Sequence, residues 1–375
     1  MKSVKLMMDS PFRNADILYS AGYYCLDAII IIETEHGKMG FFPTTELELA
    51  KKKSIVNDVH NLTAEFMKIK QEGKFPPLKS SVVIEWMRKN GYDTVVIPAN
   101  FPVIEFVNLK NHGIDIMIVE GEFHAKRISK TSDELEHIKT NSRINIEVMD
   151  GVKNIIGTSS ITDGNKLKYN GELLTSEYLQ NFIMTKFLEK GMIADSVIVA
   201  IGDQGCDPHE NGHGDVYANT SIIVDIYPRS RTNHYYTDMT RTFCKGKASD
   251  ELKNMYDCVH EAQNIVFDKL HSGADGKSIH DVVCNFFETR GYRSGNINGY
   301  LQGFFHGTGH GLGLDCHEAP YISSNGEMLP ENSVVSNEPG LYYLGIGGVR
   351  IEDLVLVTRN GYENLTNYEK VLEVE

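Results

Sequence analysis

The sequence contains few of the features that mark secreted, disulfide-linked or membrane-spanning proteins. Its 375 residues include six cysteines, and none of these forms a C-x-x-C pair. We therefore expect free thiols in a reducing compartment. The N-terminal residues hold no apolar stretch of signal-peptide length, and the longest aliphatic runs, 28–32 and 197–201, are far too short to cross a bilayer. These absences predict a soluble cytoplasmic protein with no membrane partner.

The chain also has fewer basic than acidic residues. The chain has 37 basic and 51 acidic residues, which gives a formal net charge of -14. A surface of that sign repels phosphate backbones, so we expect no nucleic-acid partner. The hydrophobic fraction of 41% is enough for an ordinary core, which argues against disorder.

The length of the chain favours two domains, because single domains are mostly shorter. Residues 1–126 alternate between strand-like and helix-like segments. The expected strands are 27–34, 38–44, 93–99 and 115–121, and a short helix is expected at 45–53. Segment 38–44 is expected to pair back on 27–34 as a hairpin. This pattern predicts a small α/β domain.

A second domain, 127–375, is expected to begin with a long helix. Thr131 and Glu134 have the spacing of a capping box, and apolar residues recur at helical spacing through 132–156. Similar segments follow, with helices expected at 176–190, 249–271 and 278–290 and strands at 196–201 and 221–227. Two helix–helix–strand halves predict an internal duplication with the sheet between them.

Four carboxylates stand inside apolar segments that are expected to be buried. They are Asp225 in SIIVDIY, Asp238 in YYTDMTRTF, Glu338 in VVSNEPGLYY and Glu352 in GGVRIEDLVLV. A buried carboxylate is costly unless it is paired or binds a metal. A single one is more often a paired or edge charge. Four in one domain exceed what a core accommodates for structural reasons.

The glycine-rich segment FFHGTGHGLGLDCHEAP adds His306, His310 and His317. Its glycines allow close approach of backbone and substrate. A lone histidine is more often a structural residue. One imidazole with four carboxylates, however, is an oxygen-rich set that suits Mn, Co, Fe or Zn. Two bridging carboxylates can hold two such ions with a shared water between them.

The order of the motifs is more specific than any one of them. With D…TDMTRTF, GTGHGLGLDCHE, NEPG and GVRIED in this order, residues 127–375 resemble the pita-bread metallopeptidases, particularly the Xaa-Pro branch that contains prolidase and aminopeptidase P. Residues 1–126 resemble the creatinase-type N-terminal domain of that family through ADILYSAGYYCLDAIIIIE. The resemblance implies an α/β (α+β) fold, with a pita-bread catalytic domain of pseudo-twofold symmetry and a smaller α/β domain.

The resemblance also implies a ligand set. In it Asp225 holds one ion, His310 and Glu338 hold the other, and Asp238 and Glu352 bridge the two. The implied nucleophile is a hydroxide shared by the ions, and Glu338 is the implied general base. The implied cofactors are two divalent ions, Mn or Co first and Zn or Fe as alternatives.

Four further residues fall at family positions near the substrate. His317 resembles a histidine that stabilises the scissile carbonyl or the tetrahedral intermediate. His209, in GCDPHENG, resembles a substrate-side histidine with a catalytic role. His306 is typical of the Xaa-Pro branch, where it helps to form the pocket, and Arg350 resembles an arginine at the substrate site that orients neighbouring carboxylates. The implied partners are a small peptide with proline at its second position and a second copy of the chain in a homodimer.

The chain departs from the family pattern between the first two aspartates. The segment from Asp225 to Asp238 is two residues longer than the pattern, and a shift in strand register there would turn Asp225 away from the metals. Dipeptidase and aminopeptidase activities both remain open, as does an aminopeptidase without proline preference. A non-catalytic creatinase-like relative that acts as a binding protein is the alternative from another class.

Overall fold

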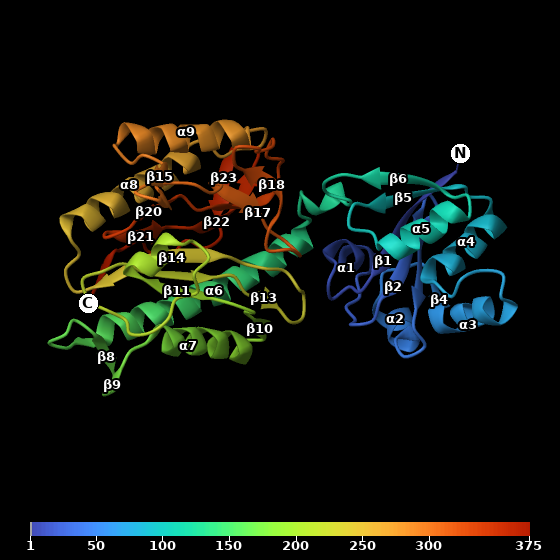
Figure 1. Cartoon of the computed structure of the whole chain (residues 1–375), viewed down its shortest axis with the longest axis horizontal. Helices are drawn as coiled ribbons and strands as arrows, with labels where there is room; N and C mark the ends of the chain where they lie inside the picture. The colour runs from blue at the N-terminus through green and yellow to red at the C-terminus, as the bar shows by residue number, and fades with distance from the viewer. Residues whose placement is uncertain (1) are drawn as a thin grey trace. The chain divides into compact units, whose positions relative to one another are not determined.

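The computed structural model describes residues 2–375, and the chain divides into two compact units, Met1–Ala125 and Lys126–Glu375. Both units combine helices and strands, and each has its own buried apolar clusters (Figure 1). Within residues 2–375, none of the helices combines the length and the apolar character that a bilayer span needs.

The first unit is built on a six-stranded mixed sheet in the order β4-β3-β2-β1-β5-β6. Its elements are β1 (Ser3–Asp9), α1 (Ala15–Ala21), β2 (Ile29–Thr34), β3 (Gly37–Phe42), α2 (Leu47–Lys53), β4 (Asp58–Asn61), α3 (Leu62–Glu72), α4 (Lys79–Asn90), β5 (Thr94–Pro98), α5 (Val103–Asn111) and β6 (Asp115–Val119). Strands β1, β2 and β3 are antiparallel neighbours, whereas β5 and β6 continue the sheet from β1 in parallel. The hairpin predicted from 27–44 is therefore present.

The isoleucine run of β2 is continuous because both faces of the sheet are covered. Ile30 and Ile32 face a core that also contains residues of α3, α4 and α5, whereas Ile29 and Ile31 face a second core with residues of α1 and α2. A strand buried on one face only would alternate apolar and polar residues.

The second unit carries four main helices, a short 3-10 helix and many short strands. The helices are α6 (Ser132–Thr158), α7 (Ser176–Glu189), η2 (Gly202–Cys206), α8 (Asp250–Phe267) and α9 (Gly276–Thr289). The strands are β7 (Ser160–Ile161), β8 (Leu167–Tyr169), β9 (Glu172–Leu173), β10 (Met192–Ile193), β11 (Ile198–Ile201), β12 (Ile222–Ile226), β13 (Arg229–Ser230), β14 (Met239–Lys245), β15 (Gly295–Ile297), β16 (Tyr300–Gln302), β17 (Gly309–Gly311), β18 (Glu318–Ile322), β19 (Val334–Asn337), β20 (Gly340–Tyr343), β21 (Gly347–Arg350), β22 (Asp353–Thr358), β23 (Gly361–Asn364) and β24 (Glu373–Val374).

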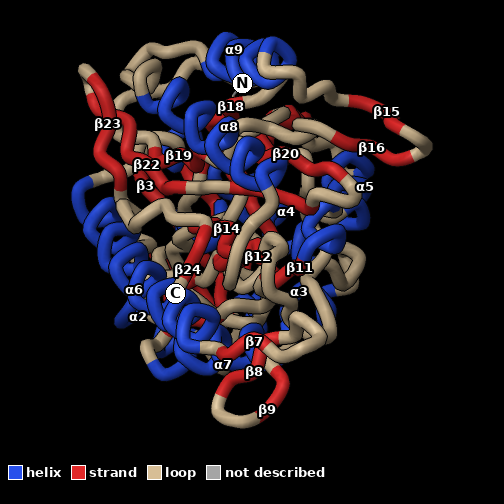
Figure 2. The backbone as a smooth tube through the Cα atoms, turned by 90° about the vertical axis from the view of Figure 1, so that its left-hand side faces the viewer, coloured by secondary structure: helices blue, strands red, loops and turns tan. Residues whose placement is uncertain are grey.

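These elements form two halves, each a pair of helices against a sheet. Helices α6 and α7 share a core with the sheet β11-β12-β14-β24, and α8 and α9 share another with strands of the sheet β18-β17-β19-β22-β23. In Figures 1 and 2 the two helix pairs lie on opposite sides of the strands. The predicted capping box of Thr131 and Glu134 starts α6. Helix α8 ends at Phe267, short of the predicted residue 271, because the chain tightens there into turns in which Lys269 N donates to Val266 O and Leu270 N to Phe267 O.

The two halves are joined where β14 meets β21 and β22. Thr242 Oγ1 accepts a hydrogen bond from Arg350 N at 3.0 Å and donates one to Arg350 O at 2.9 Å. Glu352 N donates to Thr240 O at 3.0 Å. These bonds place the start of β14 beside the turn between β21 and β22, and so bring together two of the predicted metal ligands, Asp238 and Glu352.

A fully buried ion pair supports the same junction. Arg241, 1% exposed, lies 2.6 Å from Asp353 Oδ1 through Nη2 and donates to the carbonyl oxygen of Glu352 through Nη1. Lys370 Nζ lies 2.7 Å from the other oxygen of Asp353. Removing one partner of a buried pair leaves an uncompensated charge, which costs far more than the pair itself contributes.

We therefore expect Asp353→Ala to lower the free energy of unfolding of this unit by about 3–5 kcal/mol, because it leaves Arg241 buried and unpaired. The measurement is urea unfolding followed by circular dichroism. The matched control is Glu363→Ala, which breaks an ion pair with Lys139 whose side chains are 50% and 27% exposed; its expected cost is below about 1 kcal/mol. Equal effects of the two substitutions would contradict this account of the junction.

Candidate metal centre and its cavity

A cavity of about 830 Å³ lies within the second unit and collects the predicted site residues. Its lining includes all five predicted ligands, Asp225, Asp238, His310, Glu338 and Glu352, together with His209, His306, His317 and Arg350. The other lining residues are Asp195, Ile198, Asp207, Pro208, Tyr227, Tyr236, Phe305, Gly307, Gly309, Cys316, Tyr321 and Ser323. Residues from several segments between 195 and 352 therefore line the same cavity.

The two aspartates come from neighbouring antiparallel strands. Asp225 lies in β12 opposite Thr240 of β14, and Asp238 directly precedes β14. The longer connection between them contains β13, which pairs with β10 and so accommodates the extra residues outside the β12–β14 ladder. Asp225 consequently lines the cavity and is not turned away from it.

The remaining ligand candidates come from the other sheet. His310 is the middle residue of β17, Glu338 follows β19, and Glu352 lies between β21 and β22. The glycine before His310 is required by close packing, because a Cβ at Gly309 would lie 2.0 Å from the carbonyl oxygen of Ser336.

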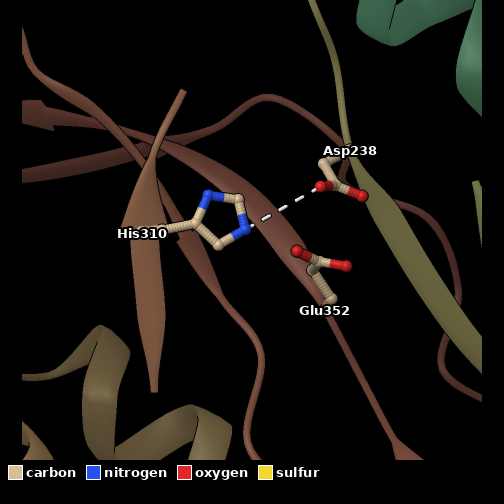
Figure 3. A group of neighbouring side chains, drawn as sticks. All are labelled: Asp238, His310 and Glu352. Carbon is tan, nitrogen blue, oxygen red and sulfur yellow. Dashed lines mark ion pairs between the residues drawn. The ribbon is translucent and has the colours of Figure 1, made fainter. Parts of the chain in front are cut away.

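Asp238, His310 and Glu352 form a group of potential metal ligands. Each offers one ligand atom, and these atoms all lie within 4.8 Å of one another (Figure 3). His310 Nε2 is 3.9 Å from Asp238 Oδ2 and 3.4 Å from Glu338 Oε1. His310 Nδ1 lies 3.1 Å from the carbonyl oxygen of Gly311, which can only accept, so Nδ1 carries the proton and the lone pair of Nε2 faces the carboxylates.

The electrostatics of this group fit divalent cations. Burial, followed by repulsion from neighbouring carboxylates, raises the pKa values of Asp238 and Glu352 well above their ordinary range. Burial likewise raises the pKa of Glu338 to about 7 and lowers the pKa of His310. The Oδ1 atoms of Asp225 and Asp238 are buried and make no hydrogen bond. A bound cation satisfies such oxygen atoms and favours the charged form of each carboxyl.

Among the Lys and Arg side chains of residues 2–375, Arg350 alone lines the cavity, and each of its three nitrogens already contacts a neighbouring oxygen. It is 3% exposed. Nη2 lies 2.8 Å from Asp225 Oδ2, Nη1 donates to the hydroxyl of Tyr342 at 3.0 Å, and Nε lies 3.4 Å from Thr240 Oγ1. This geometry favours the orienting role expected for Arg350 over direct contact with a substrate.

His306 is held in the same network. Its Nδ1 lies 2.7 Å from the carbonyl oxygen of Gly307 and its Nε2 lies 2.8 Å from the hydroxyl of Tyr342. Burial lowers its pKa to about 3, so the ring is neutral. Since the carbonyl can only accept, Nδ1 is the protonated nitrogen and Nε2 accepts from Tyr342. His306 can therefore offer a substrate the surface of its ring but no free polar atom.

The other two histidines leave more of their surface open. His317 is exposed at the cavity wall, with its ring centroid 4.0 Å from that of His310. His209 is exposed in the loop after η2, and its backbone N donates to Asp207 Oδ1 at 3.1 Å. Both side chains are therefore accessible from the cavity.

Tyr342 and Cys316 are site residues that the sequence reasoning missed. Tyr342 is fully buried and joins His306 to Arg350. The Cys316 thiol lies 3.7 Å from Asp238 Oδ2. Successive side chains of a strand point to opposite faces, so the strand GLYY predicts that one of its two tyrosines points inward. Cys316 directly precedes the predicted site residue His317. Neither signal identifies the partners of Tyr342 or Cys316.

Comparison with known proteins agrees with this geometry. The model of metallopeptidase family M24 matches residues 136–359, which is more than half of the chain, and the chain belongs to that family. An uncharacterized peptidase of Staphylococcus aureus is 32% identical over 211 residues, covering 54% of this chain and 56% of the relative. One of Staphylococcus haemolyticus is 32% identical over 257 residues, 67% of this chain and 68% of the relative. The match thus spans little more than half the length of the first of these relatives.

Solved structures share the fold over nearly the whole chain. An X-Pro aminopeptidase from Thermotoga maritima aligns with a TM-score of 0.80 at 23% identity, covering 100% of this chain and 98% of that one. A prolidase from Pyrococcus horikoshii aligns with a TM-score of 0.79 at 25% identity, covering 99% and 95%. The α/β fold expected from the resemblance is therefore confirmed.

We expect the cavity to bind transition-metal ions through its carboxylates. Asp238→Asn and Glu352→Gln should each remove at least one equivalent of tightly bound metal, because each deletes a charged oxygen ligand from the group in Figure 3. The measurement is metal content after Mn loading and dialysis. His213→Asn, at an exposed position outside the cavity, is the control and should retain the wild-type content. Wild-type content in both carboxylate variants would contradict the assignment.

Proposed function

We propose that this chain is a dinuclear metal-dependent peptidase that hydrolyses the bond between a first residue and a following proline. The observation that carries the proposal is the cavity itself, in which four carboxylates and the free Nε2 of His310 converge. Membership of family M24 and the likeness to an X-Pro aminopeptidase and to prolidases support it. A non-catalytic relative would be expected to lack several ligands, whereas all five line this cavity.

Asp225 would hold one ion, His310 and Glu338 would hold the other, and Asp238 and Glu352 would contact both. When bound, such ions polarise the scissile carbonyl and make a water molecule acidic near neutral pH. Side chains of the cavity would then orient the substrate and the water molecule and transfer protons between them. Ser336 Oγ lies 3.1 Å from Glu338 Oε1, which fixes the carboxylate proposed as general base. His317, open at the wall, would donate to the developing oxyanion, and His209 would contact the substrate from the rim.

The charges of the lining favour a peptide longer than a dipeptide. A dipeptide brings its own carboxylate close to the scissile bond, and a free Lys or Arg side chain would bind that carboxylate most strongly. Within residues 2–375 the cavity is lined by six carboxylates, the four ligand candidates with Asp195 and Asp207, and by Arg350 alone among Lys and Arg residues. That guanidinium already binds Asp225 and Tyr342. We therefore propose aminopeptidase action on Xaa-Pro-containing chains in preference to dipeptidase action.

The finer parts of the proposal rest on the sequence and the family resemblance. They are Mn or Co as the ions, a homodimer, a cytoplasmic location, and a division into a creatinase-like domain, 1–126, and a catalytic domain, 127–375.

A substrate comparison on metal-loaded protein tests the activity. We expect a tripeptide with proline second to be cleaved with a kcat/KM at least about tenfold above that of the Xaa-Pro dipeptide, the value of one missing charge-assisted contact. A Met-Ala-Ser peptide should be a poor substrate. Cleavage of the Met-Ala-Ser peptide alone would refute the proline assignment, and preference for the dipeptide would refute the length assignment.

Glu338→Gln tests the general base. We expect kcat to fall by roughly 10²–10⁴-fold, because the amide cannot accept the proton of the attacking water. Metal content is measured in parallel to separate loss of the base from loss of a ligand. Glu363→Gln, at an exposed position outside the cavity, should keep wild-type kcat. Full activity in Glu338→Gln would assign the base elsewhere.

A further inference from the structure

A second group of buried charges lies beside the cavity without lining it. Arg127 and Lys130 precede α6 and are each 4% exposed, and Glu318 begins β18 and is 2% exposed. Glu318 lies 191 residues after Arg127 and 188 residues after Lys130 in the chain. None of the three lines the cavity or belongs to the group of Asp238, His310 and Glu352.

The Glu318 carboxylate is held from three directions. Arg127 Nη2 lies 2.5 Å from its Oε2, and Lys130 Nζ lies 2.8 Å from its Oε1. The backbone N of Asp315 also donates to Oε2, at 3.3 Å. Arg127 Nη2 reaches the exposed side chain of Asp315 as well, at 2.7 Å. Arg127 therefore contacts this loop through the side chains of Asp315 and Glu318, and Lys130 contacts it through Glu318.

The loop 312–318 folds tightly around this carboxylate. Gly313 N donates to Asp315 O at 3.0 Å, and a Cβ at Gly313 would lie 2.4 Å from Glu318 Oε1. Only a residue without a side chain leaves room for the carboxylate in this turn. The backbone of Glu318 pairs with Gly311, the neighbour of His310.

The same loop carries two residues of the cavity wall. Cys316 lies near Asp238, and the ring of His317 contacts that of His310. His317 is exposed, and within residues 2–375 its ring makes no hydrogen bond, so apart from the contact with His310 its position depends on its own backbone. That backbone is anchored on the adjacent Glu318.

Stability alone does not account for such a cluster. Buried ion pairs contribute little net stability relative to apolar residues of similar volume, but their directional contacts can specify one geometry. We propose that Arg127 and Lys130, acting through Glu318, are positioning residues that hold loop 312–318, and with it His317, in the orientation that hydrolysis requires. The kinetic part of this inference rests on the proposed function; the ordering of the loop does not.

Lys130→Met and Glu318→Gln test the inference, because each removes one charge; Gln keeps the length of Glu, and Met is one atom shorter than Lys. On metal-loaded protein, well below the unfolding midpoint, we expect kcat to fall by roughly 10–100-fold, the effect of a small misplacement of a catalytic group. KM and metal content should change less than about twofold, because the groups that bind substrate and metal stay in place. Lys130→Arg keeps the charge and should retain most of kcat.

Hydrogen exchange measured by mass spectrometry supplies a readout that is independent of activity. Peptides covering 312–318 should exchange faster in Lys130→Met and Glu318→Gln, with little change elsewhere in the unit. The matched control is Lys139→Met, which breaks the exposed pair with Glu363 and should leave both kcat and exchange unchanged.

Two results would overturn the positioning role. One is a lower unfolding midpoint with wild-type kcat in both variants, which would make the cluster purely structural. The other is unchanged exchange at 312–318. If the wild-type protein cleaves no Xaa-Pro peptide, the proposed function fails, and the exchange result alone then decides whether the cluster orders the loop.

Discussion

The second unit is organised around an excess of buried negative charge. Four carboxylates that are ligand candidates converge on one cavity, which within residues 2–375 is lined by a single guanidinium, and burial with mutual repulsion raises the pKa values of Asp238 and Glu352. Such an arrangement is costly in the absence of cations. Bound divalent ions would offset this cost, because they stabilise the charged carboxylates and satisfy the buried Oδ1 atoms of Asp225 and Asp238. We therefore expect bound metal ions to make the clustering of these four buried carboxylates favourable.

The fold supplies these carboxylates from two sheets that meet at β14, β21 and β22. Asp238 and Glu352 lie next to strand ends, where the backbone hydrogen bonds of Thr240 and Thr242 join the halves. Arg350 then couples Asp225, a ligand candidate, to Tyr342 and His306. A catalytic group built on two rigid sheets is held more closely than one built on loops. The loop 312–318 is the exception, and the buried cluster of Arg127, Lys130 and Glu318 compensates for it.

Much of this site was predictable because its residues differ in polarity or size from the residues around them in the sequence. A carboxylate in an apolar strand, as at Asp225 and Glu352, stands out from the sequence, and so does a histidine among glycines, as at His310. The isoleucine run of β2 and the capping box of α6 were equally visible. Strand β1 was missed because Lys5 interrupts its apolar pattern; its amine reaches the carbonyl oxygen of Phe123 at 3.2 Å. Contacts such as Tyr342 with His306, or Lys130 with Glu318, could not be predicted from the sequence, because the two partners are far apart in the chain and meet only in the folded protein.

The central claim is that the carboxylate-rich cavity exists to hold two metal ions. The most direct measurement is a crystal structure of the protein grown with Mn²⁺, with anomalous differences recorded at the manganese edge. The account predicts two anomalous peaks in the cavity, both in contact with Asp238 and Glu352, one of them bound by Asp225 and the other by His310 and Glu338. A cavity without peaks at saturating Mn²⁺, or ions bound only elsewhere on the chain, would contradict it.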